Sequence, residues 1–186
     1  TNGDGKVSNG SNTIYDMGDL RKIGNSTPRF RTGISLDASW RGFAISMFWQ
    51  GVCGQDVYNN QKYQTDFWSL TDAGSNKGSR LLEAWTADNT SSTIPALTTN
   101  NTGDEGRASS YFVENGSYLK LRSLQLGYNV PASFLSKFKM SSARFYVSGQ
   151  NLLTIKSKSL TCADPENSNW AYPLATSISF GIQLGF

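Results

Sequence analysis

The sequence predicts an all-β protein whose antiparallel strands carry apolar residues on one face and polar residues on the other. The clearest sign is the closing stretch 177–186, where apolar residues alternate with serine, glycine and glutamine. A period of two is typical of a β-strand, because successive side chains point to opposite faces. The same period returns in four further stretches, and the connections between them alternate between short and long. No apolar run reaches the roughly 18 residues that a transmembrane helix needs.

The first two strands are expected at 30–40 and 43–51, joined as a hairpin. In the first stretch, the odd-numbered positions from 31 to 39 are polar or glycine, and the even-numbered ones are apolar except for Thr32. Only Arg41 and Gly42 separate this stretch from the next one, which alternates in the same way. Two alternating stretches that lie two residues apart predict a β-hairpin.

The stretch 53–110 is expected to be a very long loop. It loses the alternation and is rich in Asn, Thr, Ser, Gly and Asp, apart from a short segment at 79–87 that is compatible with a helix. Alternation resumes at 117–131, where the apolar residues change parity near Arg122 and Ser123. Such a change of phase predicts a β-bulge.

A short connection through 131–142 then leads to a fourth strand within 143–155. In that strand Phe145 and Val147 lie on one face, whereas Arg144 and Tyr146 lie on the other. A second long loop, at about 152–174, leads to the closing strand. Short and long connections are therefore expected at opposite ends of the sheet.

These features favour an antiparallel transmembrane β-barrel in the bacterial outer membrane, with membrane lipid against the apolar face. Such barrels have short turns at one end and long loops at the other, and strands of about 9–11 residues cross the bilayer at a tilt. Four aromatic residues are expected at strand ends, where girdles form: Trp40, Trp49, Tyr128 and Phe186. The alternative is a soluble β-sandwich that binds carbohydrate. Its candidate binding residues are loop aromatics: Trp68, Trp85 and Trp170.

The composition argues against an enzyme and against a nucleic-acid-binding protein. The sequence has no histidine, the commonest general base, and no motif that positions a serine nucleophile, a phosphate or a dinucleotide. The formal net charge of +3 is not concentrated in a basic cluster, so no nucleic-acid partner is expected. Two cysteines, Cys53 and Cys162, are too few for a disulfide scaffold and are wrongly spaced for zinc. They either form one bridge between the two long loops or remain two separately buried free cysteines.

Seven stretches, taken together and in order, carry a further signal. They are NGDGKV, DLRKIGNSTPRFRTGIS, WRGFAISMFWQGVCGQDVY, GSYLKLRSLQLGYNVP, RFYVSGQNLLTI, ADPE and SFGIQLGF. The combination resembles the SusC/RagA-type TonB-dependent outer-membrane transporters. This resemblance implies that residues 1–186 are the C-terminal part of a 22-stranded barrel, with long external loops at about 53–110 and 152–174. The N-terminal plug and the remaining strands would lie outside this chain.

The same resemblance implies a function for the whole protein. It is expected to import a nutrient, either a glycan or a peptide, with energy transmitted by TonB, and to perform no covalent chemistry. A SusD-like surface lipoprotein would bind at the long loops, and TonB would bind the missing N-terminal part. Phe186 would end the signal that the barrel-assembly machinery recognises. The aromatic residues of the long loop that are expected to contact the lipoprotein are Tyr58, Tyr63, Phe67, Trp68 and Trp85.

The loop NGDGK at 2–6 admits two interpretations. Family members often have an aspartate just upstream, which would make a run like the start of a calcium-binding loop. Asn2 and Asp4 would then supply side-chain oxygens and Lys6 a carbonyl, although the twelfth position falls on Ser11 rather than on a glutamate. The other interpretation is a Gly-rich turn at Asp4, with no cofactor.

Overall fold

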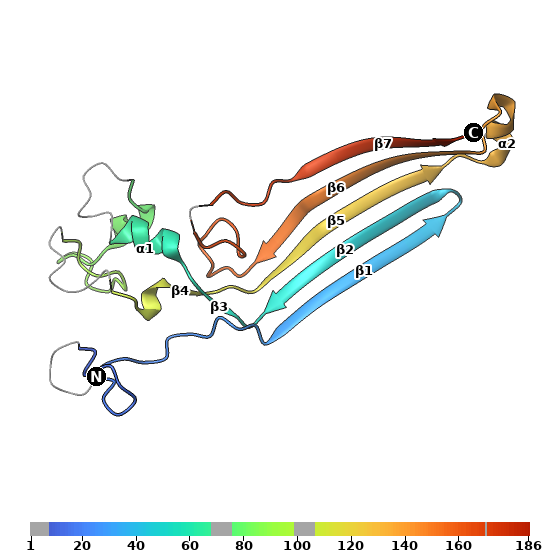
Figure 1. Cartoon of the computed structure of the whole chain (residues 1–186). Coiled ribbons are helices and arrows are strands. Elements are labelled where there is room, and N and C mark those ends of the chain that lie inside the picture. The colour runs from blue at the N-terminus through green and yellow to red at the C-terminus, as the bar shows by residue number, and fades with distance from the viewer. Residues whose placement is uncertain (1–7, 68–75, 99–106, 170) are drawn as a thin grey trace.

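The computed structural model is dominated by one five-stranded antiparallel sheet (Figure 1). The structure describes residues 8–67, 76–98, 107–169 and 171–186. The strand order is β1-β2-β5-β6-β7, and a separate two-stranded ribbon pairs β3 with β4. The strands are β1 (Phe30–Trp40), β2 (Phe43–Cys53), β3 (Asp56–Tyr58), β4 (Val113–Asn115), β5 (Tyr118–Asn129), β6 (Ser142–Lys156) and β7 (Ser177–Gly185). The helices are α1 (Asn60–Asp66), η2 (Ser79–Glu83), η3 (Ser110–Phe112), α2 (Ala132–Leu135) and η4 (Ser136–Phe138).

The two ends of the sheet differ, as the alternating connection lengths predict. At the turn end lie the hairpin turn 41–42, the short connection 130–141 with α2, and the C-terminus (Figure 1). At the loop end lie the long connections 54–117 and 157–176, together with the N-terminal segment (Figure 1). We use these two names for the ends of the sheet below.

The predicted hairpin of β1 and β2 is confirmed. Trp40 pairs with Phe43 across a two-residue turn in which Arg41 and Gly42 have φ of 49° and 90°. Positive φ at both turn residues matches the right-handed twist of the flanking strands, which is why short hairpins favour this geometry. The Arg41 guanidinium lies 4.9 Å from the centre of the Trp40 ring. The turn is thus held by its own residues.

The register aligns the apolar residues into rows that cross all five strands. Side chains that pair directly across antiparallel strands share a face. Two apolar rows are Trp40, Phe43, Tyr128, Phe145, Ile182 and Ala38, Ile45, Leu126, Val147, Phe180. A polar row on the opposite face is Asp37, Ser46, Gln125, Ser148, Ser179. The predicted alternation of faces is confirmed, and we call these faces the apolar face and the polar face.

The predicted β-bulge is confirmed at Arg122. The register of β5 against both neighbouring strands shifts between Leu121 and Ser123, so Arg122 has no direct partner on either side. The extra residue restores the alternation, because Leu121 and Leu124 both remain on the apolar face. Without it, one half of β5 would turn its apolar residues toward the polar face.

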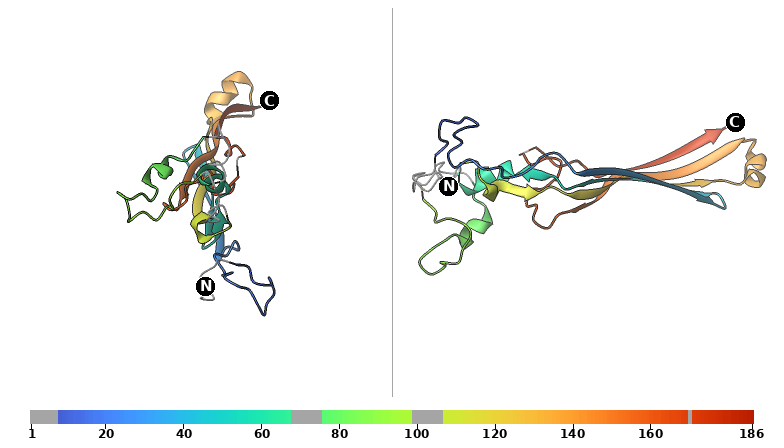
Figure 2. Two further views of the ribbon diagram at one scale, coloured as in Figure 1. Left: turned by 90° about the vertical axis from the view of Figure 1, so that its left-hand side faces the viewer. Right: turned by 90° about the horizontal axis from the view of Figure 1, so that it is seen from below.

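The sheet is a single layer. Viewed edge-on in Figure 2, it is a curved, twisted ribbon of strands, and no second sheet among the described ranges covers its apolar face. A β-sandwich would bury this face against another sheet, whereas here the Phe180 side chain is 79% exposed. The structure therefore disfavours the sandwich alternative. None of the helices in the described part of the chain is long and apolar enough to span a membrane.

Two details of the predicted strands were wrong. Trp49 lies within β2 rather than at a strand end, where it pairs with Ile34 and Leu121. The second long loop begins at 157 rather than at 152, because β6 continues to Lys156 and still pairs with Tyr118. Asn151 has a positive φ of 53°, and this irregularity interrupts the alternation that marks the strand in the sequence.

The connection 54–117 is a folded unit rather than an open loop. Its described residues form the β3-β4 ribbon, the short helices α1, η2 and η3, and a small apolar core (Figure 1). The predicted helix at 79–87 exists as the shorter η2, whereas α1 was not predicted because its polar sequence lacks an apolar period. The loop core consists of Phe67, Leu81, Ala84, Ile94 and Phe112, with Tyr63 and Tyr111 packed against it.

This loop core corrects the expectation that the aromatic residues of the long loop are exposed and contact the lipoprotein partner. Phe67 is buried in the core, and the Tyr63 ring packs edge-on against Phe112 with centroids 5.3 Å apart. The buried Asp66 carboxylate accepts a hydrogen bond of 2.7 Å from the Tyr111 hydroxyl. Packing these rings together stabilises the loop itself, because it removes their apolar surface from water.

Candidate functional site

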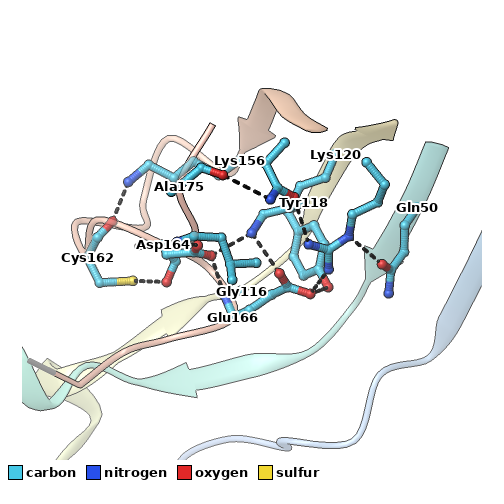
Figure 3. A network of polar contacts seen from close by, with 12 residues as sticks. Gln50, Gly116, Tyr118, Lys120, Lys156, Cys162, Asp164, Glu166 and Ala175 are labelled. Atoms are coloured by element: carbon cyan, nitrogen blue, oxygen red, sulfur yellow. Dashed lines mark hydrogen bonds and ion pairs between the residues drawn. The ribbon is translucent and has the colours of Figure 1, made fainter. Parts of the chain in front are cut away.

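The polar face carries a buried charge cluster near the loop end of the sheet. Lys120 of β5 is 2% exposed, and its Nζ donates hydrogen bonds of 2.7 Å to Asp164 Oδ1 and to Glu166 Oε2 (Figure 3). Both carboxylates come from the connection 157–176, whose ADPE segment folds against the polar face. We call Lys120, Arg122, Asp164 and Glu166 the Lys120 cluster.

The Glu166 carboxylate accepts hydrogen bonds from three side chains of β5. Its Oε1 accepts a hydrogen bond of 2.7 Å from the Tyr118 hydroxyl and a second one from Arg122 Nη2. Arg122 in turn donates through Nε to Gln50 Oε1 at 2.7 Å (Figure 3). The bulge thus has a second effect, since it adds an arginine on the polar face next to Lys120. Two cations then neutralise two carboxylates.

The carboxyl groups of the cluster are held in their charged form. Burial raises the pKa of Asp164, but the Lys120 ammonium and the backbone N–H groups of Glu166 and Leu174 outweigh it, so the pKa lies below its usual value. Burial also raises the pKa of Glu166, and the hydrogen bonds from Lys120 and Tyr118 together with the charges of Lys120 and Arg122 bring it below its usual value. The cluster is therefore an ionic clamp at neutral pH.

We expect this clamp to open only in acid. Both pKa values are depressed by folding, so the stabilisation is present above the ordinary values of 3.8 for Asp164 and 4.5 for Glu166 and is lost as the pH falls through the lower, folded values. Labelling of the buried Cys162 by a dithiodipyridine, which reacts in acid, would follow release of the connection 157–176 in the full-length protein. A rise in labelling between about pH 7 and 5 would contradict the assignment.

The two cysteines are free and differ in environment. Cys53 is exposed at the end of β2, whereas Cys162 is buried and donates its thiol hydrogen to the Asp164 carbonyl at 3.3 Å. The Lys156 ammonium also donates to the Cys162 carbonyl (Figure 3). The structure thus contradicts the predicted bridge. Both cysteines are free, but the prediction that both are buried is wrong for Cys53, which lies exposed at the end of its strand.

Thiol labelling is expected to distinguish the two cysteines. Cys53 should react quickly with a maleimide, and Cys162 slowly, because burial both hides its sulfur and raises its pKa. Mass spectrometry of the native full-length protein would measure the two rates, and the Cys53→Ser variant should retain only the slow one. Equal rates, or two unreactive cysteines in the denatured, unreduced protein, would contradict the structure.

A second buried polar link joins the two long connections to each other. Asn59 donates through its side-chain amide to Glu114 Oε2 and to Thr161 Oγ1, each at 2.9 Å. Glu114 also accepts the backbone N–H of Thr161 at 2.8 Å. Because Asn59 and Glu114 belong to 54–117 and Thr161 belongs to 157–176, the loop end is one connected assembly.

A pocket of about 500 Å³ opens on the polar face beside the Lys120 cluster. This volume lies within the roughly 300–1,000 Å³ typical of ligand sites. Both long connections and three strands of the five-stranded sheet, β1, β2 and β5, contribute to its lining. The charged and aromatic lining residues are Arg31, Asp56, Tyr58, Tyr118 and Glu166, and Gln50 is one of the polar ones. The pocket is the candidate binding site of this chain.

The residues that the sequence singles out for substrate or metal binding lie outside this pocket or outside the described residues. Trp85 is 44% exposed but belongs to the loop-core region and does not line the pocket. Trp68 and Trp170 lie outside the described residues, as do Asn2 and Asp4, so the calcium hypothesis stays a prediction. Phe186 is 89% exposed at the turn end, and its role in assembly stays a prediction.

The pocket residues were missed because no local motif marks them. Arg31 and Gln50 were visible only as members of polar strand faces, and Glu166 only as part of ADPE. The pocket residues could have been predicted only by combining the residues on the polar face of each strand with the acidic residues of the second long loop. Within the described ranges, no group of acidic residues and cysteines is placed to hold a metal ion. In the cluster, the Lys120 ammonium already occupies the space between the two carboxylates.

Comparisons with known proteins agree with this architecture. No protein-family model matches the chain. The TonB-dependent receptor P3 of Formosa agariphila is 33% identical over 90% of this chain, and the receptor P26 of the same organism is 26% identical over 100% of this chain. Structures of the RagAB peptide importer in the open-open and closed-closed states superpose with TM-scores of 0.70 and 0.71, at 31% and 30% identity over 87% and 89% of this chain.

The sheet with one apolar and one polar face, together with these sequence and structure similarities, places the protein in the class of TonB-dependent receptors. Within that class, the chain belongs to the SusC/RagA-type TonB-dependent transporter family. The chain spans only 17% and 19% of the length of the two receptors, and 17% and 18% of the two importer chains.

Proposed function

We propose that this chain is the C-terminal part of an outer-membrane β-barrel that imports a nutrient. The observation that carries the proposal is the apolar face, whose rows run unbroken across five strands and are not covered by any other part of the described chain. Such a surface is too large to remain in contact with water. Lipid is the environment that accepts an apolar face on one side of a sheet while the other side stays wet.

The edges of the sheet support barrel closure. Within the described chain, β1 and β7 each pair with one neighbour only, so each has an unpaired backbone edge. Unpaired N–H and C=O groups are too costly in a bilayer, and closure by further strands of the same polypeptide satisfies them. The proposed whole is a barrel of 22 strands in the family's pattern, with this sheet as its last part.

The proposed transport runs along the polar face, which lines the lumen of that barrel. TonB supplies the energy through the plug, and the pocket beside the Lys120 cluster forms part of the substrate path. The substrate is a peptide or a glycan, and the likeness to structures named as peptide importers favours a peptide. No covalent step is part of this function.

A SusD-like surface lipoprotein is the proposed partner at the loop end. The connections 54–117 and 157–176 form one assembly linked through Asn59, Glu114 and Thr161, which gives a partner a stable surface. With Phe67 buried in the loop core and Tyr63 packed against it, the exposed candidates for this contact are Tyr58, Leu82, Trp85 and Leu97. Aromatic and large apolar residues among polar ones are typical of such interfaces.

The experiment uses the full-length protein in its own cell. Uptake of labelled peptides and oligosaccharides should stop when TonB is disabled, because passage through a plugged barrel needs transmitted energy. Purification in mild detergent should yield the lipoprotein in near-equal amount. Uptake that is indifferent to TonB would overturn the import mechanism, and recovery of the barrel alone would overturn the proposed partner.

A further inference from the structure

The charges around the pocket are not equally compensated. Lys120 and Arg122 neutralise Asp164 and Glu166 within the Lys120 cluster, so these four groups carry no net charge. The other carboxylate in the pocket, Asp56, accepts the backbone N–H of Asn25 at 2.8 Å through Oδ2. Each carboxylate of the pocket thus has a donor from the protein.

Arg31 differs from these groups. It lies on the polar face of β1, pairs in register with Val52, and lines the pocket. Its guanidinium has no hydrogen bond and no ion pair with any residue that the structure describes, although Asp56 and Glu166 line the same pocket. A guanidinium has five donors and is always charged, so it is a ready partner for an anion with two oxygens.

Gln50 adds a second donor to the pocket. Its Oε1 accepts the hydrogen bond from Arg122 Nε, and a guanidinium can only donate, so the orientation of the Gln50 amide is determined. The Nε2 group therefore points away from Arg122, as Figure 3 shows. The bulge residue thus engages the oxygen of Gln50, and the amide N–H group of this pocket-lining residue is left as its donor.

We propose that Arg31 and the Gln50 amide bind a carboxylate of the transported ligand. The inference rests on the proposed import function and names the chemistry that its pocket selects. A carboxylate accepts two parallel hydrogen bonds from a guanidinium, which makes such a contact strong and selective. The carboxylate can belong to the terminus or an acidic side chain of a peptide, or to a uronic acid of a glycan. Arg31 recognises the same group in each case.

The test measures binding to the full-length transporter, purified with its partner, by isothermal titration calorimetry. One ligand pair is a short peptide and its C-terminal amide without acidic side chains, and the other is an oligouronate and its methyl ester. In the native protein, the acid of the pair that matches the substrate should bind about 10- to 100-fold more tightly than its neutral form, as expected for a charge-assisted hydrogen bond.

The Arg31→Gln variant should abolish this preference while leaving the affinity for the neutral form unchanged. Arg31→Lys should retain part of the preference, and Arg21→Gln, which removes a charge outside the pocket, should retain all of it. Equal loss of affinity for acid and neutral forms, or no preference in either pair, would overturn the carboxylate site. Those results leave TonB-dependent uptake intact, so they are distinguishable from failure of the proposed function.

Discussion

Replacing Lys120 by methionine is expected to release the connection 157–176 from the polar face, at a cost of about 3–5 kcal/mol in the free energy of docking. Methionine fills similar space but cannot neutralise the two carboxylates. Glu166 would still be bonded by Arg122 and Tyr118, whereas Asp164 would keep only backbone N–H donors. A buried carboxylate without a counter-charge is costly, and moving the loop into water is the easiest way to solvate it.

The labelling rate of Cys162 at neutral pH would measure this effect, because the thiol is buried in the same connection. The control is Lys158→Met, which removes an exposed lysine of that connection and should change the docking free energy by less than about 0.5 kcal/mol. Adding Asp164→Asn to Lys120→Met should recover part of the protection, since the orphaned charge is removed. Native protection in the single Lys120 variant would show that the clamp is not needed for docking.

Replacing Phe180 by arginine is expected to destabilise the assembled barrel by about 2–4 kcal/mol. Phe180 lies in the middle of β7, in an apolar row with Val147 and Leu126, and its side chain is 79% exposed. In the proposed barrel this position faces lipid near the midplane of the bilayer. An arginine there must either bury its charge in hydrocarbon or distort the bilayer to reach water.

The matched control is Ser179→Arg, one residue away on the opposite face. Ser179 pairs with Ser148, and an arginine there would extend into the wet lumen at a much smaller cost. Denaturant titration of the full-length protein in lipid vesicles would give the free energy of unfolding of each variant. Equal destabilisation by the two arginines would contradict the assignment of the faces.

The strands of the sheet were predictable because their signal is local. An apolar residue at every second position needs no knowledge of the partner strand, so the alternation at 30–40 and 177–186 was enough to define both faces. The bulge at Arg122 was predictable for the same reason, as a change of parity within one strand. Where backbone geometry interrupts the alternation, as at Asn151, the predicted start of the following loop, at 152, was wrong.

The organisation of the long connections was not predictable in the same way. Their short helices are too brief and too polar to show a period, and their stability comes from contacts between distant segments. In the sequence, nothing distinguishes Phe67 and Phe112 from an exposed aromatic residue of a loop. In the structure, the two residues pack together in the loop core. Whether such a ring is buried depends on which other segments fold over it.

The amino-acid sequence alone therefore specified the strands, their two faces and the bulge, because side-chain alternation is a property of each strand by itself. Tertiary structure decided the site. Lys120 and Asp164 are 44 residues apart, and only the fold of the second connection against β5 joins them. The same fold orients Gln50 through Arg122 and leaves Arg31 without a partner among the described residues. Charge compensation in a buried site depends on distances of a few ångströms between segments, and no local pattern encodes those distances.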